Sequence, residues 1–251
     1  MQEKTPELQK KILEEDEVVT AKIQKINFEW KENRPKEASS KPDQASPTIK
    51  KACDQLRILG GEIEKTIAAL QRVSKAKELL EMEMGDPNQL DYLHEDQQNL
   101  LEVWQKIAAV WKTIDDINAT PFQGYVHKAV KEGLEIKMNE MRDFPNKMRS
   151  YQVYETYVTH LKNYKKVNDI FADLRDDSMK PKHWKDLLRK LNIRTKQSDL
   201  TLADLWNADL LGRNKIVSDV LTQARGEAIL ETFINNIKEV WTARELELVR
   251  Y

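Results

Sequence analysis

Apolar residues recur at steps of three and four along most of the chain, the spacing that lines one face of an α-helix. The clearest run follows Asp86 and holds a heptad with one polar interruption, Gln97; its apolar members are Leu90, Leu93, Leu100, Trp104, Ile107, Trp111 and Ile114. A second run over residues 49–70 repeats the spacing, with Gly60 and Gly61 inside it. No stretch of five or more residues alternates apolar and polar positions as an amphipathic strand would. The pattern predicts an all-α chain.

Prolines mark where several of these helices are expected to begin. Each follows a residue that can cap a helix and occupies the first helical position, where a missing N–H costs nothing: Thr5-Pro6, Ser46-Pro47, Asp86-Pro87 and Thr120-Pro121. Pro145 is expected to end the fourth helix because its ring disfavours helical geometry at Phe144. Further helices are predicted over residues 146–175, 184–191 and 202–206, and from Asn214 to the end of the chain, where its apolar positions run on to Trp241.

The same pattern suggests a division of the chain. Residues 1–32 form a highly charged amino-terminal helix, and residues 33–48, with three prolines and no aliphatic side chain larger than alanine, have the composition of a flexible linker. Residues 49–144 and 145–251 are predicted to form two helical bundles. We therefore expect elongated, stacked bundles of long antiparallel helices. A sustained two-stranded coiled coil competes with this interpretation, but the many turns after residue 85 argue against it.

Composition narrows the setting of the protein. The chain has 251 residues, enough to bury a sizeable core, and 41 basic against 42 acidic residues leave a net charge of −1. The net charge of the chain therefore does not favour nucleic acid or an anionic membrane as a partner. No apolar run approaches the ~20 residues that cross a bilayer, and the amino terminus lacks a hydrophobic signal core. A single cysteine, Cys53, excludes an internal disulfide framework and fits the reducing cytoplasm.

The sequence offers no catalytic, cofactor-binding or metal-binding constellation. No glycine-rich loop precedes a lysine and a Ser or Thr, so a nucleotide phosphate site is not expected. His94-Glu95 begins like a zinc-protease helix, but position 98 is Gln98 rather than the second histidine, and the other histidines are scattered singly. Cys53 lies on the apolar face of its predicted helix, which favours a packing role over a nucleophilic one. We predict that the chain is not an enzyme.

One basic window invites a nucleic-acid interpretation. Residues 180–196 carry seven lysines and arginines against one acid, Asp186, and a tyrosine-rich stretch lies upstream at residues 151–164. The tyrosines, however, fall at helical spacing with Val158 and Leu161, which favours core or groove packing over base stacking. The basic window is better explained as a contact for an acidic protein surface or as a solvated face.

The carboxy-terminal third carries a more specific pattern. Over residues 173–251 it consists of several short motifs in a fixed order: Lys182-His183-Trp184, Leu200-Thr201-Leu202, Leu205-Trp206, Ala224, Gly226-Glu227 and Glu239-Val240-Trp241. These motifs resemble the dynein heavy chain, of the cytoplasmic type, where its tail meets its linker. The likeness weakens upstream but persists through Trp104, Trp111, Pro121 and Tyr151; before Leu56 only the helical character of a tail is seen.

The resemblance implies a non-catalytic segment of a microtubule motor, joining the cargo-binding tail to the force-generating linker and motor ring. The ATP sites and the microtubule-binding stalk of that family lie elsewhere, so it implies no cofactor, nucleic acid, membrane or direct microtubule contact for this segment. It implies a cytoplasmic, cytoskeleton-associated protein whose partners are other dynein subunits, the light intermediate chain or the second heavy chain. The residues expected to matter structurally are Trp104, Trp111, Tyr151, His183, Trp184, Leu205, Trp206 and Trp241, with His183 and Trp184 anchoring a short helix.

An alternative remains open at this point. The chain could be a free-standing helical adaptor that binds partner helices through the seam around Trp104 and Trp111, with residues 33–48 tethering a docking helix. Because the last predicted helix is still running at residues 246–251 (LELVRY), the sequence is expected to be part of a longer chain.

Overall fold

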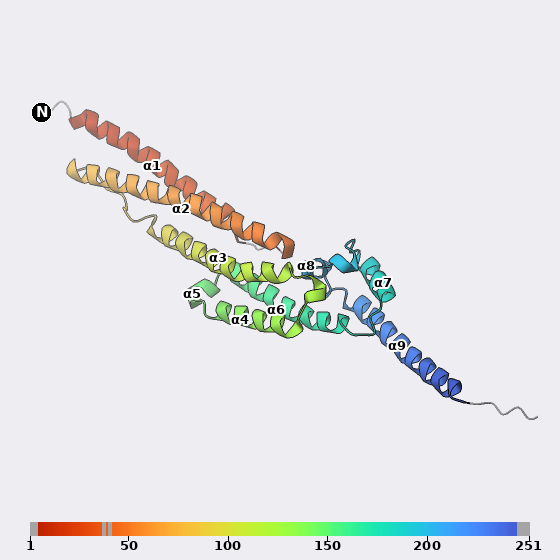
Figure 1. The fold of residues 1–251 in the computed structure, drawn as a ribbon. Helices are drawn as coiled ribbons and strands as arrows, with labels where there is room; N and C mark the ends of the chain where they lie inside the picture. Colours follow the sequence, from red (N-terminus) through yellow and green to blue (C-terminus); the bar gives the residue numbers. More distant parts are fainter. Residues whose placement is uncertain (1–4, 37–38, 40–41, 245–251) are drawn as a thin grey trace, which may run out of the picture. The chain divides into compact units, whose positions relative to one another are not determined.

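The computed structural model describes residues 5–36, 39 and 42–244, and all regular elements in this part are helices (Figure 1). The α-helices are α1 (Thr5–Asn33), α2 (Pro42–Leu79), α3 (Asp91–Asn118), α4 (His127–Arg142), α5 (Asn146–Arg149), α6 (Gln152–Leu174), α7 (Pro181–Leu191), α8 (Leu202–Asn207) and α9 (Asn214–Thr242). Two 3-10 helices, η1 (Phe122–Gly124) and η2 (Gln197–Asp199), and one isolated bridge between Pro121 and Thr201 complete them. The all-α prediction is confirmed for these residues.

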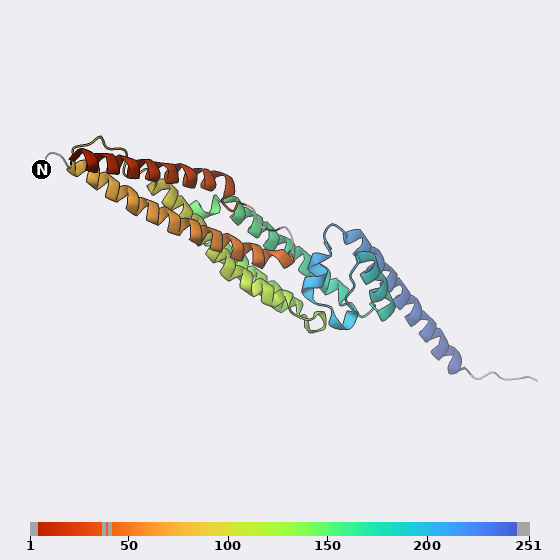
Figure 2. The ribbon, with the colours of Figure 1, turned by 90° about the horizontal axis from the view of Figure 1, so that it is seen from above.

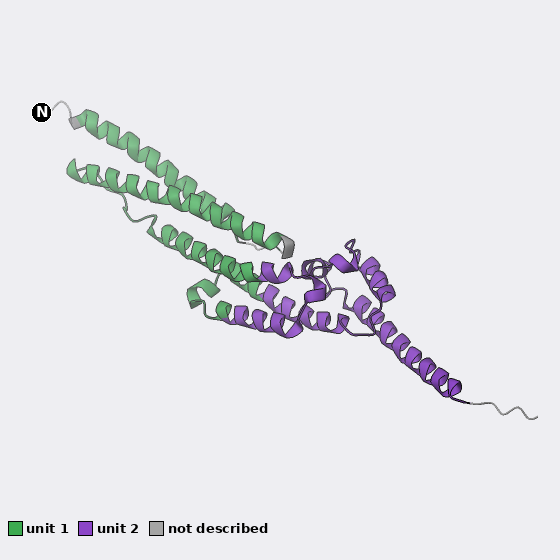
Figure 3. Ribbon diagram, in the orientation of Figure 1, with its two compact units in different colours: residues 1–113, 140–158 green, residues 114–139, 159–251 purple. Residues whose placement is uncertain are grey.

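The chain forms two compact units, coloured separately in Figure 3. Unit 1 holds residues 1–113 and 140–158, and unit 2 holds residues 114–139 and 159–251. The sequence had placed the boundary between two bundles at residues 144/145, with each bundle continuous. The observed units are discontinuous because the start of α6 packs against α3 inside unit 1, where Tyr157 contacts Trp104 and Trp111.

Several element boundaries differ from the sequence prediction. The predicted linker 33–48 is shorter, because α2 begins at Pro42 and contains Pro47. Ala45 and Ile49 lie four residues apart and are buried, so tertiary packing compensates for the backbone hydrogen bond that Pro47 lacks. Likewise α3 begins at Asp91 rather than Pro87. Before it the Asp86 side chain accepts a hydrogen bond from the Asn88 N–H, a local turn that competes with helix.

The predicted helix over residues 146–175 is interrupted. The Ser150 hydroxyl donates to the Lys147 carbonyl, and α5 and α6 are separate helices on either side of residues 150 and 151. The last helix, α9, is described to Thr242, and the predicted course over residues 245–251 lies outside the described residues.

In unit 1, α1 and α2 run antiparallel and lie side by side in both views (Figures 1 and 2). Apolar residues of both helices share one cluster, in which Val19 and Ile23 meet Leu70 and Val73. Lys77, whose side chain is 10% exposed, donates to Asp16 at 2.6 Å across the same pair. The amino-terminal helix is therefore packed along its length rather than tethered.

Gln97, the polar interruption of the heptad in α3, explains one glycine of α2. Its side chain is 2% exposed, and its amide donates to the Leu56 carbonyl at 2.8 Å. A Cβ at Gly60 would lie 2.7 Å from the Gln97 Nε2 atom, whereas a Cβ at Gly61 would meet nothing within 4 Å. The side chain of Gln97 therefore lies directly against Gly60, whereas Gly61 has open space beside it.

This difference gives a matched pair of variants. Gly61→Ala is expected to raise the free energy of unfolding by up to about 1 kcal/mol, because alanine favours a helix interior over glycine. Gly60→Ala gains the same propensity but displaces a buried, hydrogen-bonded amide, so it is expected to be less stable than Gly61→Ala by about 1–3 kcal/mol. Urea denaturation of both variants checks this, and equal stabilities would contradict it.

Candidate functional site

The predicted tryptophan seam of α3 lies in the core of unit 1. Trp104 and Trp111 are 0% and 1% exposed, and both pack edge-on against Tyr157 of α6, with ring centroids 6.1 and 4.7 Å apart. A partner helix cannot reach side chains that are already covered. The adaptor hypothesis was therefore wrong in assigning partner binding to these two residues; they pack the interior.

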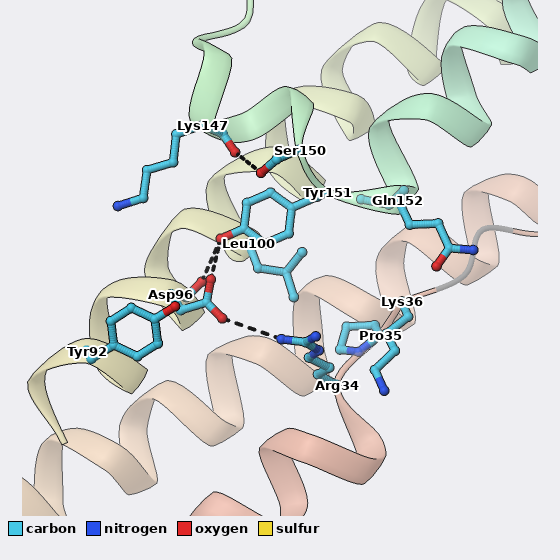
Figure 4. A pocket seen from close by; sticks show the side chains of 11 residues that line it. Arg34, Pro35, Lys36, Tyr92, Asp96, Leu100, Lys147, Ser150, Tyr151 and Gln152 are labelled. Atoms are coloured by element: carbon cyan, nitrogen blue, oxygen red, sulfur yellow. Dashed lines mark hydrogen bonds and ion pairs between the residues drawn. The ribbon is translucent and has the colours of Figure 1, made fainter. Parts of the chain in front are cut away.

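Tyr151, another predicted residue, lies in a pocket of unit 1 of about 460 Å³ (Figure 4). Three segments line it: the residues after α1, the amino-terminal half of α3, and the turn between α5 and α6. Its walls are Arg34, Pro35, Lys36, Tyr92, Asp96, Leu100, Lys147, Ser150, Tyr151, Gln152 and Val153. The sequence predicted Tyr151 as a structural residue and Leu100 as part of an apolar helical face, whereas the other nine come from segments with no shared spacing.

The polar groups of this pocket bind one another. Asp96 lies between Arg34, 3.5 Å away, and the Tyr151 hydroxyl, which donates to its carboxylate at 2.5 Å (Figure 4). Burial and the neighbouring carboxylate raise the pKa of Tyr151 above its usual range, so its hydroxyl keeps the proton it donates. Lys147 is bound to Glu95 at 2.5 Å. The arrangement contains no nucleophile beside a base, and its evident effect is to hold the end of α1 and the start of α6 to α3.

The contribution of this contact can be measured. Tyr151→Phe removes the hydrogen bond to a charged acceptor and is expected to cost about 1–3 kcal/mol of unfolding free energy. Tyr92→Phe on the same pocket wall is the control: its side chain is 82% exposed, and a change within about 0.5 kcal/mol is expected. Chemical denaturation compares the two, and equal effects would show that the Tyr151 hydroxyl does not stabilise this junction.

In unit 2 the predicted anchors His183 and Trp184 are both buried on α7. The Lys180 N–H donates to Nδ1 of His183 at 3.1 Å, so the ring hydrogen is on Nε2, which donates to Glu227 of α9 at 3.0 Å. The histidine thus caps its own helix and binds α9. Trp184 is 4% exposed and packs against Phe122, with centroids 5.1 Å apart.

Two further predicted residues of unit 2, Leu205 and Trp206, belong to the same core. Leu205 is 0% exposed on α8, and Trp206 beside it packs edge-on against Phe171 of α6 at 5.4 Å. Thr201 and Asp204 form a reciprocal cap that begins this six-residue helix. Five of the eight predicted residues are therefore aromatic or aliphatic core residues, and His183 is a buried polar one.

The sequence reasoning missed a buried polar network in unit 2. Asn168 is 0% exposed; its carbonyl and side-chain oxygen accept from the Tyr125 hydroxyl, and its amide donates to the His127 carbonyl at 3.4 Å. Arg175 also donates to the Tyr125 carbonyl. An isolated asparagine among apolar helical positions was the only available signal, since its partners are more than 40 residues away.

Glu227 joins α9 to α7 because its carboxylate binds both Lys182 and His183 of α7. Hydrogen bonds from Lys182, Gln223 and His183 lower the pKa of Glu227 from 4.5 to about 2. A depressed carboxyl pKa means that its stabilising effect is complete above about pH 4.5 and is lost as the pH falls towards 2.

The pH dependence of the unfolding free energy measures the contribution of the ionised Glu227. We expect the wild-type chain to be more stable than Glu227→Gln near neutral pH and the difference to shrink between about pH 5 and pH 2. Urea denaturation of both proteins across that range measures it. A difference that stays constant with pH would show that the ionised Glu227 does not contribute to folding.

Trp241 does not belong to either core. The sequence pattern placed it on the inward face of the last helix, but its side chain is 61% exposed in the structure. The large apolar residues of α9 after Ala224 are exposed with it, whereas Val217, Val220 and Leu221 before it are buried. Periodicity identified the apolar face correctly but not whether anything covers it.

The single cysteine of the chain is a buried residue of α2. Cys53 is 5% exposed, and burial raises the pKa of its thiol. In the part of the chain that the structure describes, no three metal-ligating side chains come together, and no helix combines the length and hydropathy that crossing a membrane requires.

Residues 90–251, which span the cores around Trp111 and Trp184, match the family model described as dynein heavy chain, N-terminal region 2. The chain belongs to the dynein heavy chain family. It is 34% identical over 245 residues to the cytoplasmic dynein heavy chain of Paramecium tetraurelia, covering 97% of this chain. It is 32% identical to that of Dictyostelium discoideum over 99% of the chain, and 30% identical to that of Drosophila melanogaster over 100%.

The resemblance first seen in the dynein-like motifs of residues 173–251 is thus confirmed. The likeness extends beyond the upstream limit set from the motifs, since the alignments reach nearly the whole chain. This dynein segment spans only about 5% of the length of each of these three relatives.

Proposed function

We propose that this segment is a non-catalytic structural part of a microtubule motor heavy chain, connecting the cargo-binding tail to the force-generating linker and motor ring. The whole motor would carry out minus-end-directed transport. The observation that carries the proposal is the match of residues 90–251 to N-terminal region 2 of the dynein heavy chain.

The packing of the segment supports a mechanical role. Large side chains from several helices interdigitate in both units, such as Trp111 with Tyr157 and Trp184 with Phe122. Closely packed interiors have low compressibility and transmit strain, which is the property that a connecting element needs. The polar groups of the pocket at Asp96 are used for internal contacts, which also favours structure over catalysis.

The proposal includes the setting of the segment. We place it in the cytoplasm, associated with the cytoskeleton, with the light intermediate chain or the second heavy chain as partners. It would need no cofactor and would not itself bind nucleic acid, membrane or the microtubule.

A full-length heavy chain carrying this segment tests the role. Trp184→Ala should loosen α7 and uncouple the motor, so that gliding velocity falls severalfold while the microtubule-stimulated ATPase rate stays within about twofold. Tyr92→Ala, at an exposed position, should change neither. A parallel loss of ATPase and gliding, or normal gliding in a variant shown to be locally unfolded, would contradict the proposal.

A further inference from the structure

A second, smaller pocket of unit 1 lies where the end of α1 passes α2. Residues 29–35 line it from one side and residues 55–62 from the other. Its volume is about 210 Å³, less than half that of the pocket at Asp96. Pockets that hold whole small-molecule ligands usually measure about 300–1,000 Å³, so this one has the size to take a single side chain. We call it the α1–α2 pocket.

Part of the α1–α2 pocket is aliphatic. Leu56 and Ile58 line it, the first buried and the second 67% exposed. Leu59 and Pro35 add further aliphatic surface. Ile58, Leu59 and Glu62 are spaced by three and four residues, so they share one face of α2. A ligand that follows this face would contact aliphatic groups first and then a carboxylate.

The carboxylates of the α1–α2 pocket come from both helices, Glu29 from α1 and Glu62 from α2. Among the described residues, the exposed carboxylate of Glu62 has no ion-pair partner. That of Glu29 meets Lys25 at 3.6 Å, and because Lys25 is 72% exposed this pair contributes little and is easily replaced. Both carboxylates are therefore able to bind a cation that enters the pocket.

Arg34, the cation of the lining, does not neutralise them. Its guanidinium binds Asp96 at 3.5 Å, on the wall of the other pocket (Figure 4), and lies 5.8 Å from the centre of the Trp30 ring. Its charge is thus directed away from Glu29 and Glu62. The α1–α2 pocket combines aliphatic surface with uncompensated negative charge, and this combination is complementary to a side chain that has a methylene stem and a cationic end.

We propose that the α1–α2 pocket receives an arginine side chain from a segment of a partner protein. The methylene stem covers Ile58 and Leu59, and the guanidinium, with five N–H donors in one plane, binds Glu29 and Glu62 together. A lysine ammonium is a point charge and fits two carboxylates on different helices less well. The inference rests on contacts within unit 1 and does not depend on the proposed role in the motor.

A protein segment is favoured over the free amino acid as the source of this side chain. Free arginine would bring its own carboxylate towards the same acidic rim, whereas an arginine within a peptide chain has no such charge. The expected order of affinity is therefore arginine with both ends blocked, then blocked lysine and free arginine, and last the uncharged analogue citrulline.

Titration of the 251-residue chain with N-acetyl-L-arginine N-methylamide measures the site. The isoleucine methyl signals are followed by NMR, and Ile58→Val identifies the Ile58 signal. We expect Ile58 to shift with a dissociation constant in the low millimolar range, as suits one side chain. Ile136, which is 57% exposed on α4, should not shift. Blocked citrulline has nearly the same shape but no charge, and it should bind about tenfold more weakly or not at all.

Substitutions on α2 test the location. Glu62→Gln should weaken the binding of blocked arginine about fivefold. Glu64→Gln is the matched control, because Glu64 is equally exposed on the same helix but lies outside the pocket, beside His94; it should bind like the wild type. Both changes are at the surface, and far-UV circular dichroism should show the same helix content for both.

Four results would overturn the proposal. They are the absence of a saturable shift at Ile58, equal binding of blocked arginine and blocked citrulline, binding that is unchanged by Glu62→Gln, and tighter binding of free arginine than of the blocked form. The last would assign the pocket to a small molecule instead of a protein segment. Each of these outcomes leaves the proposed structural role of the chain in the motor unaffected.

Discussion

Trp184→Ala is expected to lower the free energy of unfolding by about 3–5 kcal/mol, the largest effect we predict in unit 2. The indole is 4% exposed and fills the space between α7 and Phe122, and truncation would leave a cavity that the surrounding helices cannot close fully. Chemical denaturation measures the loss. Hydrogen exchange should locate it in α7 and the first half of α9, which His183 and Glu227 join.

Trp241→Ala is the matched control for this prediction. It removes the same side chain from the same kind of helix, but from a position that is 61% exposed. Its effect should therefore stay within about 0.5 kcal/mol. Comparable losses at both positions would mean that Trp184 does not anchor α7.

Trp111→Ala is expected to cost a similar amount in unit 1, about 3–5 kcal/mol. Its ring is 1% exposed and meets Tyr157 at 4.7 Å, an edge-on geometry that adds about 0.5–1.5 kcal/mol to the burial of the ring. Thermal and urea denaturation should both show the loss.

Tyr92→Ala on the same helix provides the comparison. This aromatic side chain is 82% exposed, so its removal should leave stability nearly unchanged. If Trp111→Ala were as mild as Tyr92→Ala, the α3–α6 contact would not be a principal part of the unit 1 core.

Helical spacing predicts only a small part of the pocket at Asp96. Tyr151 could be selected from its helical register, but Arg34 follows a different helix and Asp96 belongs to the polar face of a third. Arg34 reaches Asp96 because of the path of the chain after α1, which is a tertiary effect. Tyr151 reaches Asp96 because the helix breaks at Ser150, where a local hydrogen bond competes with the helix.

The sequence by itself determined the helical class, the apolar face of each long helix and the family. A 3.6-residue period needs only local information, and the ordered motifs of residues 173–251 can be recognised from the sequence alone. The tertiary structure alone decided what covers those faces: Trp104 and Trp111 are enclosed, and Trp241, with the same periodicity, is not. It also decided why Gly60 and Gln97 occur together and where the units divide. The physical reason is that a period fixes the direction of a side chain about its own helix, whereas burial depends on a second helix that arrives from a distant part of the chain.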